Sequence, residues 1–174
     1  MQKRSNPNPI VSSICGLVAG GLAGAAMDCY WWAVRRLPGE RPEQKPKSGD
    51  DNQDKPEPST QIIADRVTTA LTGHHVPAED KPAAGIAVHY ATSLFYGGLL
   101  GAAASRVPRL GLLAGLLYGA AIWLLLDEIT LRLLDIAPDP RKVPARQHLQ
   151  ALGAHFVYGT ATALVTRLLL RVLS

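Results

Sequence analysis

The sequence predicts an all-α integral membrane protein with four transmembrane helices, arranged as two antiparallel hairpins. Three observations favour this class. Four apolar segments rich in Leu, Ala and Gly are each long enough to cross a bilayer, which takes about 20 helical residues. A polar stretch, residues 35–82, separates the first segment from the other three and lowers the mean hydropathy of the whole chain. Short polar connections separate the remaining segments, as is usual in helical bundles.

The first unit, residues 1–34, combines a polar N-terminal tail with a first transmembrane helix over residues 10–34. This apolar run is too long for a signal peptide, and Asp28 and Cys29 interrupt any small-residue cleavage pattern. The aromatic residues at 30–32 are typical of a membrane interface. We therefore expect the segment to stay in the membrane as a helix.

The second unit, residues 35–82, is a polar linker that contains one short helix. Pro, Gly and charges of both signs dominate its first half, which leaves little to bury. Apolar residues at helical spacing then predict an amphipathic surface helix over about residues 59–72. Ser59 and Thr60 are suited to cap its start, and Gly73 to end it.

The third unit, residues 83–174, is predicted to hold the other three transmembrane helices. We place them at residues 83–105, 110–131 and 148–173, joined by the link RVPR at 106–109 and by a Pro-rich basic loop at 132–147. The four-residue link predicts that the helices on either side of it form a tight antiparallel hairpin.

An internal repeat is suggested by the glycines of the first and third predicted transmembrane helices. The alignment of GLVAGGLAGAAM with GLLAGLLYGAAI matches two sets of three glycines. Gly16, Gly20 and Gly24 align with Gly111, Gly115 and Gly119, respectively. Small residues at every fourth position let helix backbones approach closely in lipid, which predicts packing faces here. Two readings stay open, because a Gly/Ala/Leu-rich composition can mimic a duplication of two hairpins.

Five ionisable side chains interrupt the apolar segments: Asp28, His89, Asp127, Glu128 and His155. If the four helices alternate in direction, each of these residues lies four to eight residues from one of two loops on the same side of the membrane. The sequence therefore predicts a polar cluster at one depth, about 6–12 Å below that face. Ionisable groups within a membrane usually face the bundle interior and pair with one another.

Several roles fit this cluster. It could relay protons, since imidazole titrates near neutrality, or it could bind a divalent metal through His and carboxylate ligands. It could instead fix helix register through charge-assisted hydrogen bonds, or its members could extend to the lipid headgroups. A structural or interfacial role is the plainer reading, and proton or ion handling is the leading functional one.

Other function classes have little support in the sequence. The chain has no nucleophile motif, phosphate-binding glycine loop or paired-cysteine metal spacing, so we do not expect an enzyme, and no cofactor is indicated. Its net charge of +4 forms no basic stripe with interleaved aromatics, which argues against nucleic-acid binding. The expected partner is the lipid bilayer, together with other membrane subunits or a second copy of the chain.

Four stretches of the sequence carry a family resemblance: AVHYATSLFYGGLLGA, GLLYGAAIWLLLDEITLRLLDIAPDP, LGAHFVYG and the early GLVAGGLAGAAMD. They resemble the YagU-like family of small bacterial inner-membrane proteins. W-x3-D-E, from Trp123 to Glu128, and H-x2-Y-G, from His155 to Gly159, are the more specific matches. The resemblance implies about four helices in a bacterial inner membrane and brings no established activity. One family member is associated with acid tolerance, which suits proton handling; the alternative is an accessory or scaffold subunit.

Overall fold

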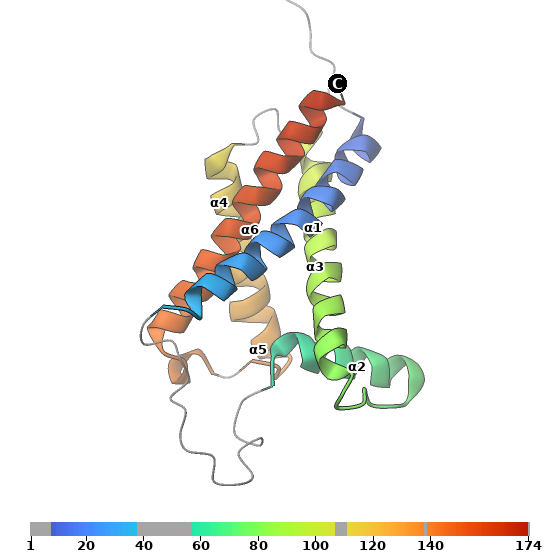
Figure 1. Ribbon diagram of the computed structural model, residues 1–174, viewed down its shortest axis with the longest axis vertical. Coiled ribbons are helices and arrows are strands. Elements are labelled where there is room, and N and C mark those ends of the chain that lie inside the picture. The colour runs from blue at the N-terminus through green and yellow to red at the C-terminus, as the bar shows by residue number, and fades with distance from the viewer. Residues whose placement is uncertain (1–7, 38–56, 107–110, 138, 174) are drawn as a thin grey trace, which may run out of the picture.

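The computed structural model describes residues 8–37, 57–106, 111–137 and 139–173, and this part of the chain is helical, with turns and no strands (Figure 1). Three predicted features lie wholly or mostly outside the described residues: the polar N-terminal tail, the polar first half of the linker and the RVPR link.

Three of the helical segments are long and apolar enough to cross a membrane. They are α1 (Pro9–Val34), α3 (Lys81–Ala104) and a continuous segment made of α4 (Leu112–Ile122), η1 (Trp123–Thr130) and α5 (Leu131–Leu133). The fourth long helix, α6 (Ala145–Val172), has 28 residues but is more polar and is not one of the three. The membrane crossing by α6 therefore stays a prediction. A short 3-10 turn, η2 (Pro140–Lys142), precedes α6.

The long helices alternate in direction. In Figure 1, α1 and α4 run toward the end of the molecule that carries α2, while α3 and α6 run away from it. α1 packs against α3 and α6, and α6 also packs against α4. α3 and α4 touch through side chains, as where the Tyr118 hydroxyl donates to the carbonyl oxygen of Tyr96 at 2.5 Å. Their backbones pack less closely than those of the other neighbouring helices, so a tight hairpin around the RVPR link stays a prediction. The arrangement of four crossings as two membrane hairpins stays a prediction.

Glycines on α1 and α3 bring these two backbones into contact. A Cβ atom on Gly16 would lie 2.7 Å from the Cα of Gly101, and one on Gly20 would lie 2.8 Å from the Cα of Gly97. Real Cβ atoms do not approach another backbone so closely. The crossing therefore needs glycine on both helices, which is the close packing that small residues allow in membranes.

α4 and α6 repeat this crossing. A Cβ atom on Gly115 would lie 2.7 Å from the Cα of Thr160, and one on Gly159 would lie 2.6 Å from the amide nitrogen of Gly119. Gly111, by contrast, precedes the helix and has no atom within 4 Å of its would-be Cβ. The prediction that Gly111 packs against a helix is therefore wrong.

The two glycine crossings in the structure therefore correspond in a register that differs from the sequence alignment by four residues, which is about one helical turn. Gly97 lies between Gly16 and Gly20, as Gly159 lies between Gly115 and Gly119. Gly24, the third member of the first set, faces the side chains of Ser93 and His89 instead. In the shifted register, Asp28 and Asp127 correspond, since each follows the second glycine of its pair by eight residues.

The amphipathic helix is confirmed as α2 (Ser59–Thr72), and Gly73 ends it in the left-handed conformation with φ 75°. The expected capping by Ser59 and Thr60 is wrong, because the helix starts directly after Pro58 and has no side-chain cap. α2 lies across one end of the bundle and packs on α3 (Figure 1). The guanidinium of Arg66 donates to the carbonyl oxygens of Leu134 at 2.6 Å and Asp135 at 3.2 Å, which ties α2 to the end of α5.

Asp65 joins α2 to the turn that follows it. One carboxylate oxygen lies 2.9 Å from Nδ1 of His75, and the other accepts from the backbone amide of Val76 at 2.8 Å. The hydrogen bond with His75, and then that from the Val76 amide, lower the pKa of Asp65 below 3.8. Because the pKa is depressed by folding, these bonds stabilise the turn fully above pH 3.8 and less as the pH falls through the lower folded value.

This linkage gives a first prediction. The amide resonance of Val76, followed by NMR during acidification, should shift below pH 3.8 as its acceptor becomes protonated. Asp65→Asn should remove that titration, because an amide does not ionise in this range. Asp80→Asn, a nearby change of the same kind at a residue without a capping bond, should leave it intact. A Val76 shift that persists in Asp65→Asn would contradict the assignment.

Candidate functional site

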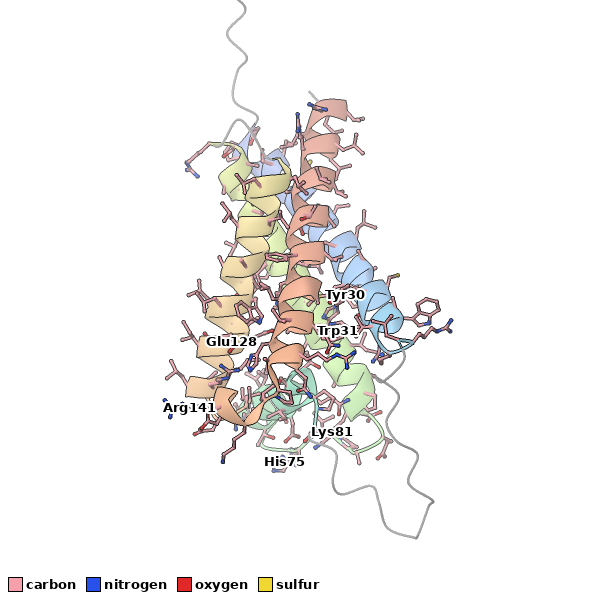
Figure 2. The ribbon with its side chains drawn as sticks, turned by 90° about the vertical axis from the view of Figure 1, so that its left-hand side faces the viewer. Tyr30, Trp31, His75, Lys81, Glu128 and Arg141 are labelled. Carbon is pink, nitrogen blue, oxygen red and sulfur yellow. The ribbon has the colours of Figure 1, made fainter. Side chains whose placement is uncertain are left out.

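A cavity of about 710 Å³ lies between the long helices, near the end covered by α2. Its wall includes all five ionisable residues predicted to share one depth: Asp28, His89, Asp127, Glu128 and His155. Pro58, Ser59, Thr60 and Ile63 contribute the α2 side of the wall. Figure 2 shows Glu128 and Trp31 at one level, farther from the end of the bundle than Arg141, His75 and Lys81. The cavity therefore brings ionisable side chains together between otherwise apolar helices.

Asp127 and Glu128 lie on a π-helical segment, η1, which interrupts the third long helix over eight residues. The hydroxyl of Thr130 donates to the carbonyl oxygen of Leu125, five residues earlier, at 2.7 Å. π-helical turns widen a helix, are rare and are frequent at functional sites. The sequence gives no signal for this segment, because its residues fit an α-helix equally well.

Glu128 is fully partnered. It pairs with Arg132 one turn later, and Nδ1 of His148 lies 2.7 Å from its other oxygen. The side chains of Glu128 and Arg132 are 14% and 17% exposed, so this pair is largely removed from water. The sequence reasoning missed Arg132, which it assigned to a loop, and did not include His148 in the cluster. Glu128 therefore forms a structural ion pair with Arg132, and its contact with His148 holds the start of α6 against the third long helix.

Asp28 lies at the open rim of the cavity, with its side chain 53% exposed. The Tyr90 hydroxyl donates to one carboxylate oxygen at 2.9 Å, and Nε2 of His89 lies 3.4 Å from the other. This carboxylate is therefore partly solvated and has a hydrogen-bond donor from α3.

Asp127 differs from the other two acids because none of the described residues forms a hydrogen bond with it. Its nearest charged partner is His155, whose Nδ1 lies 3.7 Å from the carboxylate. That Nδ1 donates to the carbonyl oxygen of Ala151 at 2.9 Å, which fixes the proton of a neutral His155 on Nδ1. Nε2 is then left as an acceptor without a partner in the described chain, on a residue only 7% exposed. Asp127 and His155 thus form an under-bonded acid–imidazole pair on the cavity wall.

The remaining wall is largely apolar and aromatic. Met27, Ile122 and Leu126 line it together with the rings of Trp31 and Tyr158. Tyr158 lines the cavity, and its hydroxyl donates to the carbonyl oxygen of Ser93 at 2.6 Å. The tyrosines within the helices also pack, since Tyr118 and Tyr158 both join apolar clusters.

Metal binding is the least supported role for the cluster. Over the described ranges, no three His, Cys, Asp or Glu side chains converge in an arrangement that could hold a metal ion. Four of the five residues instead form two acid–imidazole pairs, Asp28 with His89 and Asp127 with His155, while Glu128 pairs with His148.

No family model, curated protein or solved structure matches this chain. The resemblance to the YagU-like family therefore stays a prediction.

Proposed function

We propose that the chain is a non-enzymatic, multi-pass protein of a bacterial inner membrane that binds and transfers protons at Asp127 and His155. One observation carries this proposal: Asp127 is an acid without a hydrogen bond, next to a buried imidazole, on the wall of a cavity between membrane-length helices. Ionisable residues inside a membrane are functional candidates by default, because burying them without partners is costly.

The proposal includes four crossings of the membrane, with α6 as the fourth. α6 is long enough to span, since about 20 residues suffice, and it packs on both α1 and α4. Apart from Tyr158, its buried face consists of small and polar residues, which contribute to its lower hydropathy: Ala154, His155, Gly159, Thr162, Ala163 and Thr166. Arg167 and Arg171 lie near its end, where long basic side chains can extend to the headgroups.

The pair can change its charge with little rearrangement. With Nδ1 of His155 donating to Ala151, a proton from the cavity would add to Nε2, and the resulting imidazolium would face the Asp127 carboxylate. A proton on Asp127 instead would remove its charge and its attraction to His155. Both sites border one cavity, so protons can pass between them through water held there.

Proton flux into liposomes containing the purified protein tests this function. After an external acid step, an enclosed pH-sensitive dye should report faster acidification with the wild-type chain than with empty liposomes. Asp127→Asn should reduce the protein-dependent rate at least tenfold, and Asp80→Asn, the same chemical change at a residue without a side-chain cap bond, should leave it unchanged. Equal rates for wild type and Asp127→Asn would reject the proposal.

The alternative, an accessory or scaffold subunit, depended on glycine faces that would pack against partner helices. The glycines of both crossings are occupied within the chain, so they no longer favour a partner. A role in acid tolerance fits the proton-binding pair, and it would appear as poorer survival in acid of cells that carry Asp127→Asn.

A further inference from the structure

The cavity wall carries more negative than positive charge. Three carboxylates line it, against the single guanidinium of Arg132, which is committed to Glu128. Asp28 and Asp127 therefore remain without a basic side chain of fixed charge, since their neighbours His89 and His155 are charged only when protonated. A ligand of this cavity should be a cation, because an anion would be repelled.

Two unpartnered polar groups point to where the charge of a ligand would lie. The Asp127 carboxylate has no hydrogen bond among the described residues, and its side chain is 29% exposed and lines the cavity. Nε2 of His155, on a residue more than nine-tenths buried, also has no hydrogen bond there and borders the same space. Polar groups of buried residues are normally satisfied, so an unpartnered Nε2 on a largely buried histidine, next to an unpartnered carboxylate, indicates a place for a partner.

The size and surface of the cavity indicate what the rest of the ligand is like. A volume of about 710 Å³ lies within the range of pockets for drug-sized molecules and far exceeds that of one inorganic ion. Beside Asp127 the wall offers Met27, Ile122 and Leu126, with the rings of Trp31 and Tyr158. Aromatic faces attract organic cations as well as apolar groups.

We propose that the cavity binds a monovalent organic cation with an apolar or aromatic body. Its charge lies against the Asp127 carboxylate, and its body lies along the apolar and aromatic wall. This inference rests on the proposed function, because the cation and the proton compete for the same carboxylate. Binding therefore weakens as the pH falls and displaces a proton when Asp127 carries one.

Other charged groups and imidazoles face the cavity from the elements packed around it. They are Asp28 on α1, His89 on α3, Glu128 on η1, Arg132 on α5, and His148 and His155 on α6; α2 contributes only uncharged residues. Protonation of any of the three imidazoles adds positive charge to the wall, so it acts in the same direction as protonation of Asp127.

A pair of probe ions with matched shape tests the proposal. Tetraphenylphosphonium and tetraphenylborate have similar size and apolar surface but opposite charge. Equilibrium dialysis with the purified protein in detergent should show saturable binding of the phosphonium ion that strengthens from acid to neutral pH. Asp127→Asn should weaken its binding at least tenfold, whereas Asp80→Asn should not change it. Tetraphenylborate should show no saturable binding.

Two outcomes would overturn the inference. Equal binding of both ions would mean that the cavity selects only apolar surface. Phosphonium binding that survives in Asp127→Asn would place the charge elsewhere. Proton flux, measured without any organic cation, separates this inference from the proposed function: flux that depends on Asp127, without phosphonium binding, would reject the ligand and keep the proton site.

Discussion

Gly20→Ala should lower the free energy of unfolding by about 2 kcal/mol, within the range for overpacked cores. The added methyl group would lie 2.8 Å from the Cα of Gly97 and close to the carbonyl oxygen of Ser93, and both are backbone atoms that cannot move aside independently. α1 and α3 would have to separate, which also loosens the cavity between them. Unfolding in mixed micelles with increasing SDS measures this change.

The adjacent glycine supplies a matched control in the same helix. A Cβ atom on Gly21 would meet only the Cδ2 atom of Leu94, at an ordinary 3.4 Å. Gly21→Ala should leave stability unchanged or raise it by up to about 1 kcal/mol, because alanine favours helix. If Gly20→Ala and Gly21→Ala unfold alike, the close α1–α3 crossing is wrong.

Glu128→Leu should lower the free energy of unfolding by about 3 kcal/mol. The substitution leaves the largely buried guanidinium of Arg132 without its carboxylate, and removing one partner of a buried ion pair typically costs about 3–5 kcal/mol. The lower end applies because Arg132 is near the end of its helix and can partly extend toward water. The same SDS titration measures the loss.

A double variant distinguishes the ion pair from general damage to η1. Replacing both charges, in Glu128→Leu with Arg132→Leu, leaves no isolated charge and should recover most of the lost stability. A double variant as unstable as Glu128→Leu alone would mean that the pair does not determine the effect. His148 keeps its place in both variants, so it does not bias the comparison.

The depth of the polar cluster could be predicted from the sequence, while its pairing could not. Counting residues from the two loops placed Asp28, Asp127 and His155 at one level, and all three line one cavity. Which acid meets which imidazole depends on how each helix is rotated about its axis, and four helices without strong amphipathic patterns leave that rotation undetermined. The contact of Glu128 with His148 was missed for this reason, and its pair with Arg132 was missed because the predicted helix ended at residue 131.

The register of the glycine contacts and the π-helical segment also could not be predicted from the sequence. The sequence favours aligning Gly16 with Gly111, because GLVAGGLAGAAM matches the segment from Gly111 at more positions than the segment from Gly115. Packing against α6 selects Gly115, since Gly111 precedes the helix. The extra width of η1 likewise depends on tertiary contacts that no local pattern encodes.

Infrared difference spectroscopy during a pH titration in lipid tests the central claim most directly, because it detects a single protonated carboxyl group. Acidification should produce the carbonyl band of a carboxylic acid shielded from bulk water. Asp127→Asn should remove that band, and Asp80→Asn should retain it. The same band at full intensity in Asp127→Asn would contradict the account, because the proton would then be on another acid.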